Sequence, residues 1–231
     1  FCKSSSINIE GEILLQTEIE KADAMKVDQA LNHLNERDIP AAEALLRDVC
    51  SRCPDEYVYE YTRKESRYIK FWSVMEFTEY VAKGEADNAQ QTVIWILSAY
   101  PRACFYLAYV LVDKHDLVGA LKWLNRGKIM EPQNPNFLLE MGVVHAHMKE
   151  SQRSFECYEK TLNMKNLSND KQAIALRGMG VQLIDLQQWD EAESYLNASM
   201  EIEPENEIAK RELLYLLRFD LKEVQKKRNH G

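Results

Sequence analysis

Glycine and proline are scarce in this sequence, with eight glycines and six prolines among 231 residues. An all-β sandwich places these residues at many tight turns, so their scarcity favours helices. No run of about 18 apolar residues occurs, and the sequence therefore predicts no membrane-spanning helix. The patterns G-x-x-x-x-G-K-[ST], G-x-S-x-G and H-E-x-x-H are also missing. Because these enzyme signatures are missing, we expect no catalysis.

A surplus of basic residues is missing as well. The chain has 37 acidic and 29 basic residues, for a net charge of −8. Since nucleic-acid binding usually needs a basic surface, the composition argues against a nucleic-acid partner. An acidic surface agrees with solubility alone, and also with long-range attraction of a basic partner protein. Both interpretations stay open.

The five cysteines are an odd number, and most are scattered: Cys2, Cys50, Cys53, Cys104 and Cys157. A helical chain of this length does not need disulfides, so we expect a reducing, cytoplasmic setting. Cys50 and Cys53 have metal-ligand spacing, but a structural zinc site usually adds a second such pair, and none occurs. We therefore expect both residues to end a packed helix, with no metal and no cofactor. A redox role would need β–α–β surroundings, and no strand is predicted.

The first residues, Phe1-Cys2-Lys3-Ser4, have no apolar core of a signal peptide. The chain does not start with Met, so a removed upstream segment, or a lipid on Cys2, stays open as an alternative. We expect no membrane association. His145 and His147 are two positions apart, so on a helix they point in different directions and do not predict a metal pair. The many acidic residues include no pair that stands out for acid–base chemistry.

One spaced pattern recurs along the chain: a small residue, an apolar residue four positions on, and proline eight further. Its occurrences are Ala42–Leu46–Pro54, Ala89–Val93–Pro101, Ala120–Leu124–Pro132 and Ala192–Leu196–Pro204. Units of this size are too small to bury their own apolar faces, so neighbouring units must stack. The pattern therefore predicts a stack of helical hairpins.

The clearest unit covers residues 173–206. One face of its first helix carries Leu176, Met179, Gly180 and Leu183. A second helix starts at Trp189 and ends before Pro204, because proline pushes the preceding residue out of the helical region. These residues resemble the tetratricopeptide repeat (TPR), in which small residues such as Gly180 and Ala192 let two helix backbones approach closely. The resemblance covers residues 23–206 and implies an all-α, right-handed solenoid.

The TPR register predicts about five hairpins, followed by a capping helix with a polar outer face. The expected divisions are a leader and helix (1–22), TPR-like units at 23–56 and 70–100, a connector at 57–69, TPR units at 101–134, 135–172 and 173–206, and a capping helix with a basic tail (207–231). The unit at 70–100 carries Phe77 where a small residue is usual. The connector holds Tyr57, Tyr59, Tyr61 and Tyr68, which either pack under the solenoid or form an exposed patch.

The resemblance also implies a concave groove lined by the first helix of each unit. The residues at its groove positions are Phe71, Val74, Arg102, Phe105, Tyr109, Asp113, Asn136, Leu139, Val143, His147, Arg177 and Val181. The Lys and Asn with which TPR co-chaperones grip a carboxylate are missing at the matching positions. The remaining surface suits an amphipathic helix or an extended apolar segment, with Phe105 and Tyr109 as anchors. A groove covered by the chain's own N-terminal helix, or closed by a tighter superhelix, stays open as an alternative.

These observations predict a non-catalytic protein-binding module, adaptor-like or secretion-chaperone-like, that holds an apolar peptide or helix of a partner protein. One alternative is an immunity- or antitoxin-type neutraliser that covers a basic partner, whose binding should weaken steeply with salt. Another is a structural scaffold that self-associates, as a homodimer, through the connector tyrosines. Light scattering over a range of concentrations distinguishes this last alternative.

Overall fold

The computed structural model describes residues 9–63, 65–82 and 92–228. The chain divides into an N-terminal unit, Phe1–Glu131, and a C-terminal unit, Pro132–Gly231. Three parts of the sequence expectations lie outside the described residues: Cys2, the small residue Ala89, and the end of the basic tail (229–231). In the described ranges, no helix combines the length and the apolar composition that a membrane crossing requires.

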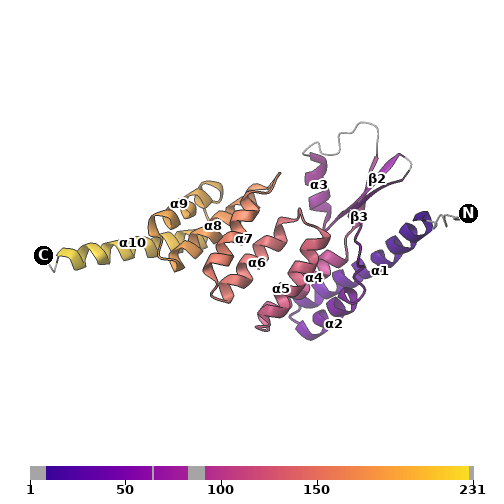
Figure 1. Cartoon of the computed structure of the whole chain (residues 1–231), viewed down its shortest axis with the longest axis horizontal. Coiled ribbons are helices and arrows are strands. Elements are labelled where there is room, and N and C mark those ends of the chain that lie inside the picture. Colours follow the sequence, from indigo (N-terminus) through magenta and orange to yellow (C-terminus); the bar gives the residue numbers. More distant parts are fainter. Residues whose placement is uncertain (1–8, 64, 83–91, 229–231) are drawn as a thin grey trace, which may run out of the picture. The chain divides into compact units, whose positions relative to one another are not determined.

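The C-terminal unit is helical throughout its described elements (Figure 1). They are α6 (Pro135–His147), α7 (Ser151–Leu162), α8 (Asn169–Asp185), α9 (Trp189–Ile202) and α10 (Glu207–Arg228). Each helix packs against the next one from α6 to α10, so that two helical hairpins and a final helix follow one another. The predicted fold class, a solenoid of TPR-like hairpins with a capping helix, is confirmed. The described residues contain four such hairpins, where the sequence predicted about five. The outer face of α10 is less polar than expected, because Leu214, Tyr215 and Leu217 are exposed.

Glycines allow the helices of the C-terminal unit to approach closely. A Cβ added at Gly180 would lie 2.7 Å from Leu196 Cγ and 3.1 Å from the carbonyl oxygen of Ala192. This is the close approach that the small residues Gly180 and Ala192 predict. Gly142 on α6 and Gly178 on α8 both face the buried ring of Tyr158, at 2.7 Å and 2.6 Å from an added Cβ. Tyr158 therefore fills the space between these helices.

The N-terminal unit has two helical hairpins in its described part: α1 (Ile9–Asn35) with α2 (Ile39–Cys50), and α4 (Tyr100–Asp113) with α5 (Leu117–Met130). The expected leading helix and the first TPR helix are one continuous helix, α1. α2 also packs against α4, so the two hairpins stack although 49 residues separate α2 from α4 in the sequence. A side-chain N-cap stabilises the start of α2 and of α5. Asp38 accepts a hydrogen bond from Ala41 N at 3.2 Å, and Asp116 accepts one from Gly119 N at 2.9 Å.

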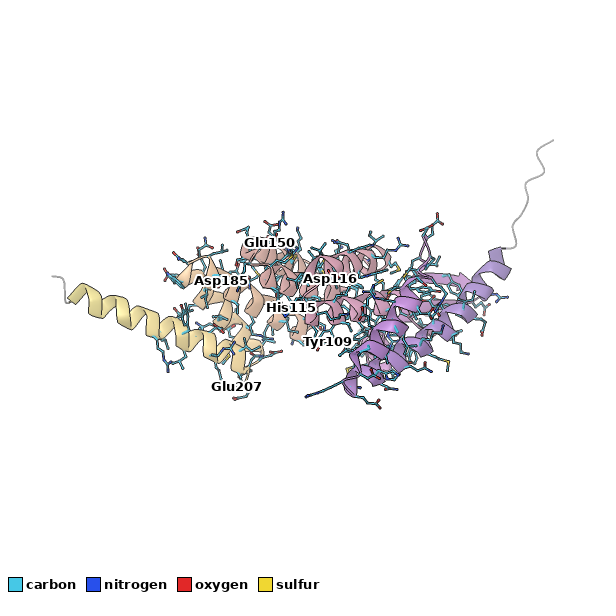
Figure 2. The ribbon with its side chains drawn as sticks, turned by 90° about the horizontal axis from the view of Figure 1, so that it is seen from below. Tyr109, His115, Asp116, Glu150, Asp185 and Glu207 are labelled. Carbon is cyan, nitrogen blue, oxygen red and sulfur yellow. The ribbon has the colours of Figure 1, made fainter. Side chains whose placement is uncertain are left out.

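The four described hairpins share one turn conformation. The residue two positions before the start of each second helix is left-handed, with φ of 61–62° at Arg37, His115, Lys149 and Gln187. The backbone N–H groups of these residues donate to carbonyls three positions back, and those of the next residues donate five positions back. Helices often end with a left-handed residue in this hydrogen-bond pattern, and that residue is usually glycine because it has no Cβ. In this chain, residues with a Cβ adopt the conformation at all four turns. Figure 2 shows His115 and Asp116 in one of these turns.

The segment between the two N-terminal hairpins differs from the prediction. It contains β1 (Glu60–Arg63), β2 (Ser66–Phe71), α3 (Val74–Ala82) and β3 (Thr92–Leu97). The described strands form a sheet of order β1-β2-β3, with β1 antiparallel to β2 and β3 parallel to β2 (Figure 1). The predicted TPR-like hairpin at 70–100 is therefore wrong, and so is the expectation that the chain has no strands. We call the described residues between 57 and 99 (57–63, 65–82 and 92–99) the sheet insertion.

The residues of β3 explain the error. The sequence Thr92-Val93-Ile94-Trp95-Ile96 is β-branched or aromatic throughout, which favours a strand over a helix. The pattern Ala89–Val93–Pro101 has the spacing of a TPR second helix, but Val93 lies in β3 and Pro101 lies in the first turn of α4. Spacing at three positions therefore predicted a helix where the chain forms a strand.

Two of the connector tyrosines, Tyr61 and Tyr68, lie opposite each other on β1 and β2. Their rings stack, with centroids 4.8 Å apart.

A buried ion pair fastens the sheet insertion to α1. Lys70 Nζ of β2 lies 2.5 Å from Glu20 Oε2, and both side chains are buried. Tyr57 Oη and the backbone N–H of Ala99 both donate to the other carboxylate oxygen at 3.3 Å. Burial raises the pKa of Glu20 above its ordinary value, and the adjacent Lys70 opposes this shift. Because unpaired buried charges are costly, the pair fixes where the sheet lies on α1.

Candidate protein-binding face

The predicted groove residues fall into both units, and each unit is described separately. The N-terminal unit holds Phe71, Val74, Arg102, Phe105, Tyr109 and Asp113. The C-terminal unit holds Asn136, Leu139, Val143, His147, Arg177 and Val181.

Phe71 and Val74 do not lie on a TPR helix, because the hairpin predicted for them is replaced by the sheet insertion. Phe71 is the last residue of β2 and is buried. Its ring centroid lies 5.6 Å from that of Phe77 and 5.3 Å from that of Tyr80, both on α3. Val74 is the first residue of α3 and is exposed. Phe71 therefore belongs to the core between sheet and helix, and its assignment to a groove is corrected.

On α4, the predicted residues differ in exposure. Arg102 is buried, donating to Asp28 Oδ1 at 2.6 Å and to the carbonyl of Ser98 at 3.2 Å. Phe105 is half-buried, whereas Asp113 is exposed and Tyr109 is 55% exposed. Tyr109 is labelled on this helix in Figure 2. α4 therefore presents Tyr109 and Asp113 outward, while Arg102 joins α4 to α1.

Phe105 is partly covered by a residue that the sequence reasoning missed. Trp72 follows β2 and precedes α3 in the sequence. Its ring centroid lies 5.3 Å from that of Phe105 and 6.4 Å from that of Tyr106, both on α4. Its Nε1 donates to Glu131 Oε2 at 2.7 Å, which holds the ring in place. The sequence left open that the N-terminal helix covers this groove. In the structure, part of the α4 face is covered by the sheet insertion. Because Trp72 is far from α4 in the sequence, no sequence pattern predicts its contact with Phe105.

In the C-terminal unit the predicted residues lie on α6 and α8. Leu139 is buried and packs with Tyr158, Ala175 and Met179. Asn136, Val143 and Val181 are half-buried, and His147 is exposed. Arg177 is held by Glu203 Oε2 at 2.9 Å and by Ser199 Oγ at 3.3 Å. The first helices of this unit thus combine half-buried valines with polar side chains, which lie near the ends of α6 and in the middle of α8.

The acidic residues at the hairpin turns pair with neighbouring groups. Glu150 lies 2.7 Å from His145 Nδ1 and accepts from Arg153 at 3.1 Å. The hydrogen bond with His145 is the main cause that lowers the pKa of Glu150. Asp185 at the end of α8 accepts from Ser151 Oγ at 3.4 Å, and Figure 2 shows Glu150 and Asp185 in neighbouring turns. These contacts stabilise the turns.

Three solved structures are similar to this chain over most of its length. PilF of Pseudomonas aeruginosa is 12% identical, with a TM-score of 0.60 over 90% of this chain and 72% of that chain. A tetratricopeptide repeat protein from Parabacteroides merdae is 14% identical, with a TM-score of 0.54 over 90% of this chain and 64% of that chain. MamA of strain AMB-1 is 12% identical, with a TM-score of 0.51 over 88% of this chain and 85% of that chain. Neither a protein-family model nor a curated protein matches the sequence. At these identities the similarity concerns the fold, and the chain has the TPR fold.

Proposed function

We propose that this chain is a non-catalytic protein-binding module whose first helices hold an apolar peptide or helix of a partner protein. The TPR fold supports a protein partner, because it presents a series of parallel first helices to the outside. The observation that carries the proposal is Tyr109, whose side chain is 55% exposed on α4 at a position that faces ligands in this fold. Exposed aromatic rings on a rigid helix are typical anchors of protein interfaces.

The surroundings of Tyr109 indicate the chemistry of the partner. Val112, on the same helix, is half-buried, and Asp113 is exposed. An apolar anchor beside the exposed carboxylate of Asp113 favours a partner segment that carries apolar residues next to a lysine or arginine. This composition agrees with an adaptor or a secretion-type chaperone.

The test compares two tyrosines of similar exposure. Tyr109→Ala removes the proposed anchor, and Tyr215→Ala on α10, where the tyrosine is 49% exposed, is the matched control. The full chain is used as bait in native lysate, and the protein retained in stoichiometric amount is purified for affinity measurement. We expect Tyr109→Ala to weaken binding by about 10- to 100-fold, as for an interface hot spot, and Tyr215→Ala to leave it unchanged. Equal affinities of the Tyr109→Ala variant and the wild type would contradict the proposal.

The net charge of −8 favours one second candidate, a neutraliser that covers a basic partner. Its affinity would depend on many exposed acidic residues and would fall steeply as salt is raised. An apolar anchor predicts little salt dependence. Measuring the affinity of the retained protein at low and at high salt therefore separates the two functions. Self-association in place of a partner would appear as a mass that grows with concentration in light scattering.

A further inference from the structure

Three cysteine thiols meet in the N-terminal unit. Cys104 Sγ lies 4.0 Å from Cys50 Sγ and 3.9 Å from Cys53 Sγ, and all three sulfur atoms lie within 4.8 Å of one another. Cys50 and Cys104 are buried, and Cys53 is half-buried. None of these three cysteines takes part in a disulfide. We call these three residues the thiol cluster.

Two packed helices bring the thiol cluster together. α2 ends at Cys50, and the turn that follows returns Cys53 to the helix end, where its backbone N–H donates to the carbonyl of Cys50 at 3.2 Å. Cys104 lies near the start of α4, which packs against α2. The C-x-x-C spacing thus supplies two ligand positions on one turn, and the helix contact supplies a third from 51 residues further along the chain.

The sulfur spacing suits one bound metal ion. With zinc–sulfur bonds of about 2.3 Å, two thiolates on the same ion lie about 3.8 Å apart in tetrahedral geometry and about 4.0 Å apart in trigonal geometry. The distances from Cys104 Sγ to the other two sulfur atoms, 3.9 Å and 4.0 Å, match these values. Thiolates are soft ligands that favour zinc or monovalent copper over magnesium or calcium.

An open pocket gives access to the thiol cluster from one side. It has a volume of about 390 Å³, and its lining consists of Cys50, Cys53, Lys122, Trp123, Asn125, Arg126 and Ile129. Arg126 is held at the pocket by a 2.6 Å hydrogen bond to the carbonyl of Pro54. Three thiolates around one divalent ion leave one net negative charge. The cations Lys122 and Arg126 along the pocket offset that charge.

We propose that the thiol cluster binds one zinc ion through Cys50, Cys53 and Cys104, with a fourth coordination position that opens to the pocket. Each thiol gives up its proton when the ion binds, and a water molecule fills the fourth position. Three protein ligands with one open position is the arrangement of zinc sites that accept an exchangeable ligand. The sequence argued against a metal because it has no second C-x-x-C pair, but this fold provides the third ligand from a single distant cysteine.

The experiment measures zinc binding by the reduced, metal-free full chain in competition with a chromophoric chelator. Wild type should take up one zinc ion per chain, and cobalt in place of zinc should show the absorption of thiolate-to-metal charge transfer. Cys53→Ser removes a half-buried ligand and should lose the stoichiometric zinc. Cys157→Ser is the matched control, because it makes the same chemical change at a buried cysteine of α7.

Stability provides a second measurement that does not depend on optical signals. Zinc should raise the unfolding temperature of wild type and of Cys157→Ser, since an ion that binds only the folded state stabilises it. Zinc should leave the unfolding temperature of the Cys53→Ser variant unchanged, and circular dichroism checks that this variant is folded. No zinc uptake by wild type, or equal zinc binding by Cys53→Ser, would overturn the proposal. Uptake of monovalent copper without any uptake of zinc would overturn the assignment of the ion.

Discussion

The buried ring of Tyr158 leaves no room for a methyl group at the glycines that face it. A Cβ at Gly178 would lie 2.6 Å from Cε2 and from Cζ of the ring, and one at Gly142 would lie 2.7 Å from Cζ. Contacts this short force the ring or a helix to move. Because the ring is buried and close to both α6 and α8, it has little space into which it can shift.

Two opposing effects set the size of the penalty for Gly178→Ala. Adding a methylene-sized group to a packed core costs about 1–3 kcal/mol, whereas alanine is better than glycine inside a helix by about 1 kcal/mol. Gly178 lies in the interior of α8, so both effects apply. Because the added Cβ would lie only 2.6 Å from a buried ring, we take the upper part of the first range, about 2–3 kcal/mol. The free energy of unfolding should therefore fall by about 1–2 kcal/mol.

Urea unfolding of the full chain, followed by circular dichroism, measures this loss. The control is the same substitution in a Tyr158→Ala background, where the ring that collides with the new Cβ is gone. There we expect Gly178→Ala to be neutral or stabilising, so that the double-mutant cycle shows a coupling of about 1–3 kcal/mol. An equal penalty in both backgrounds, or a Gly178→Ala protein as stable as wild type, would refute this account of the packing.

Three further predictions concern the N-terminal unit and the hairpin turns. Burial raises the pKa of Glu20, so the folded state binds the proton of this carboxyl group more tightly than the unfolded chain does. The free energy of unfolding should therefore decrease as the pH rises above the ordinary carboxyl pKa of 4.5 and through the raised pKa. Glu20→Gln should remove that decrease in urea unfolding measured across the pH range. Trp72→Phe keeps a ring against Phe105 but loses the hydrogen bond to the buried Glu131, and should cost about 1–3 kcal/mol in the same assay. Lys149→Gly relieves a left-handed residue with φ of 62° and should raise the free energy of unfolding by up to about 1 kcal/mol in the same assay, whereas a loss of stability would contradict the turn argument.

The helical hairpins were predictable because their signals are local or repeat at short range. Gly180, Ala192 and Pro204 are close in sequence, and each has a steric role within one hairpin. The spacing predicted a TPR helix at β3, because Val93 and Pro101 fit the TPR pattern. The segment forms a strand, since its residues are mostly β-branched. The β-branched and aromatic composition of residues 92–96, taken together with the spacing, predicts the strand.

The contacts that shape the candidate sites were beyond the sequence for a different reason. Trp72 covers Phe105 only because the sheet insertion returns to α4, and no periodicity in the sequence carries this information. Cys104 likewise joins Cys50 and Cys53 only through the packing of α2 on α4. Both are long-range contacts made by single residues. The exposure of Tyr109, by contrast, follows from its position on α4.

The central claim, that the face of α4 around Tyr109 binds a partner protein, is tested most directly by site-specific photo-crosslinking. A photoreactive phenylalanine analogue replaces Tyr109 in one variant and Tyr215 in another, and each is irradiated in native lysate. The account predicts one crosslinked partner at position 109, at low and at high salt, and none at position 215. Crosslinking at position 215 alone, or none at position 109 while the partner is still retained by the bait, would contradict it.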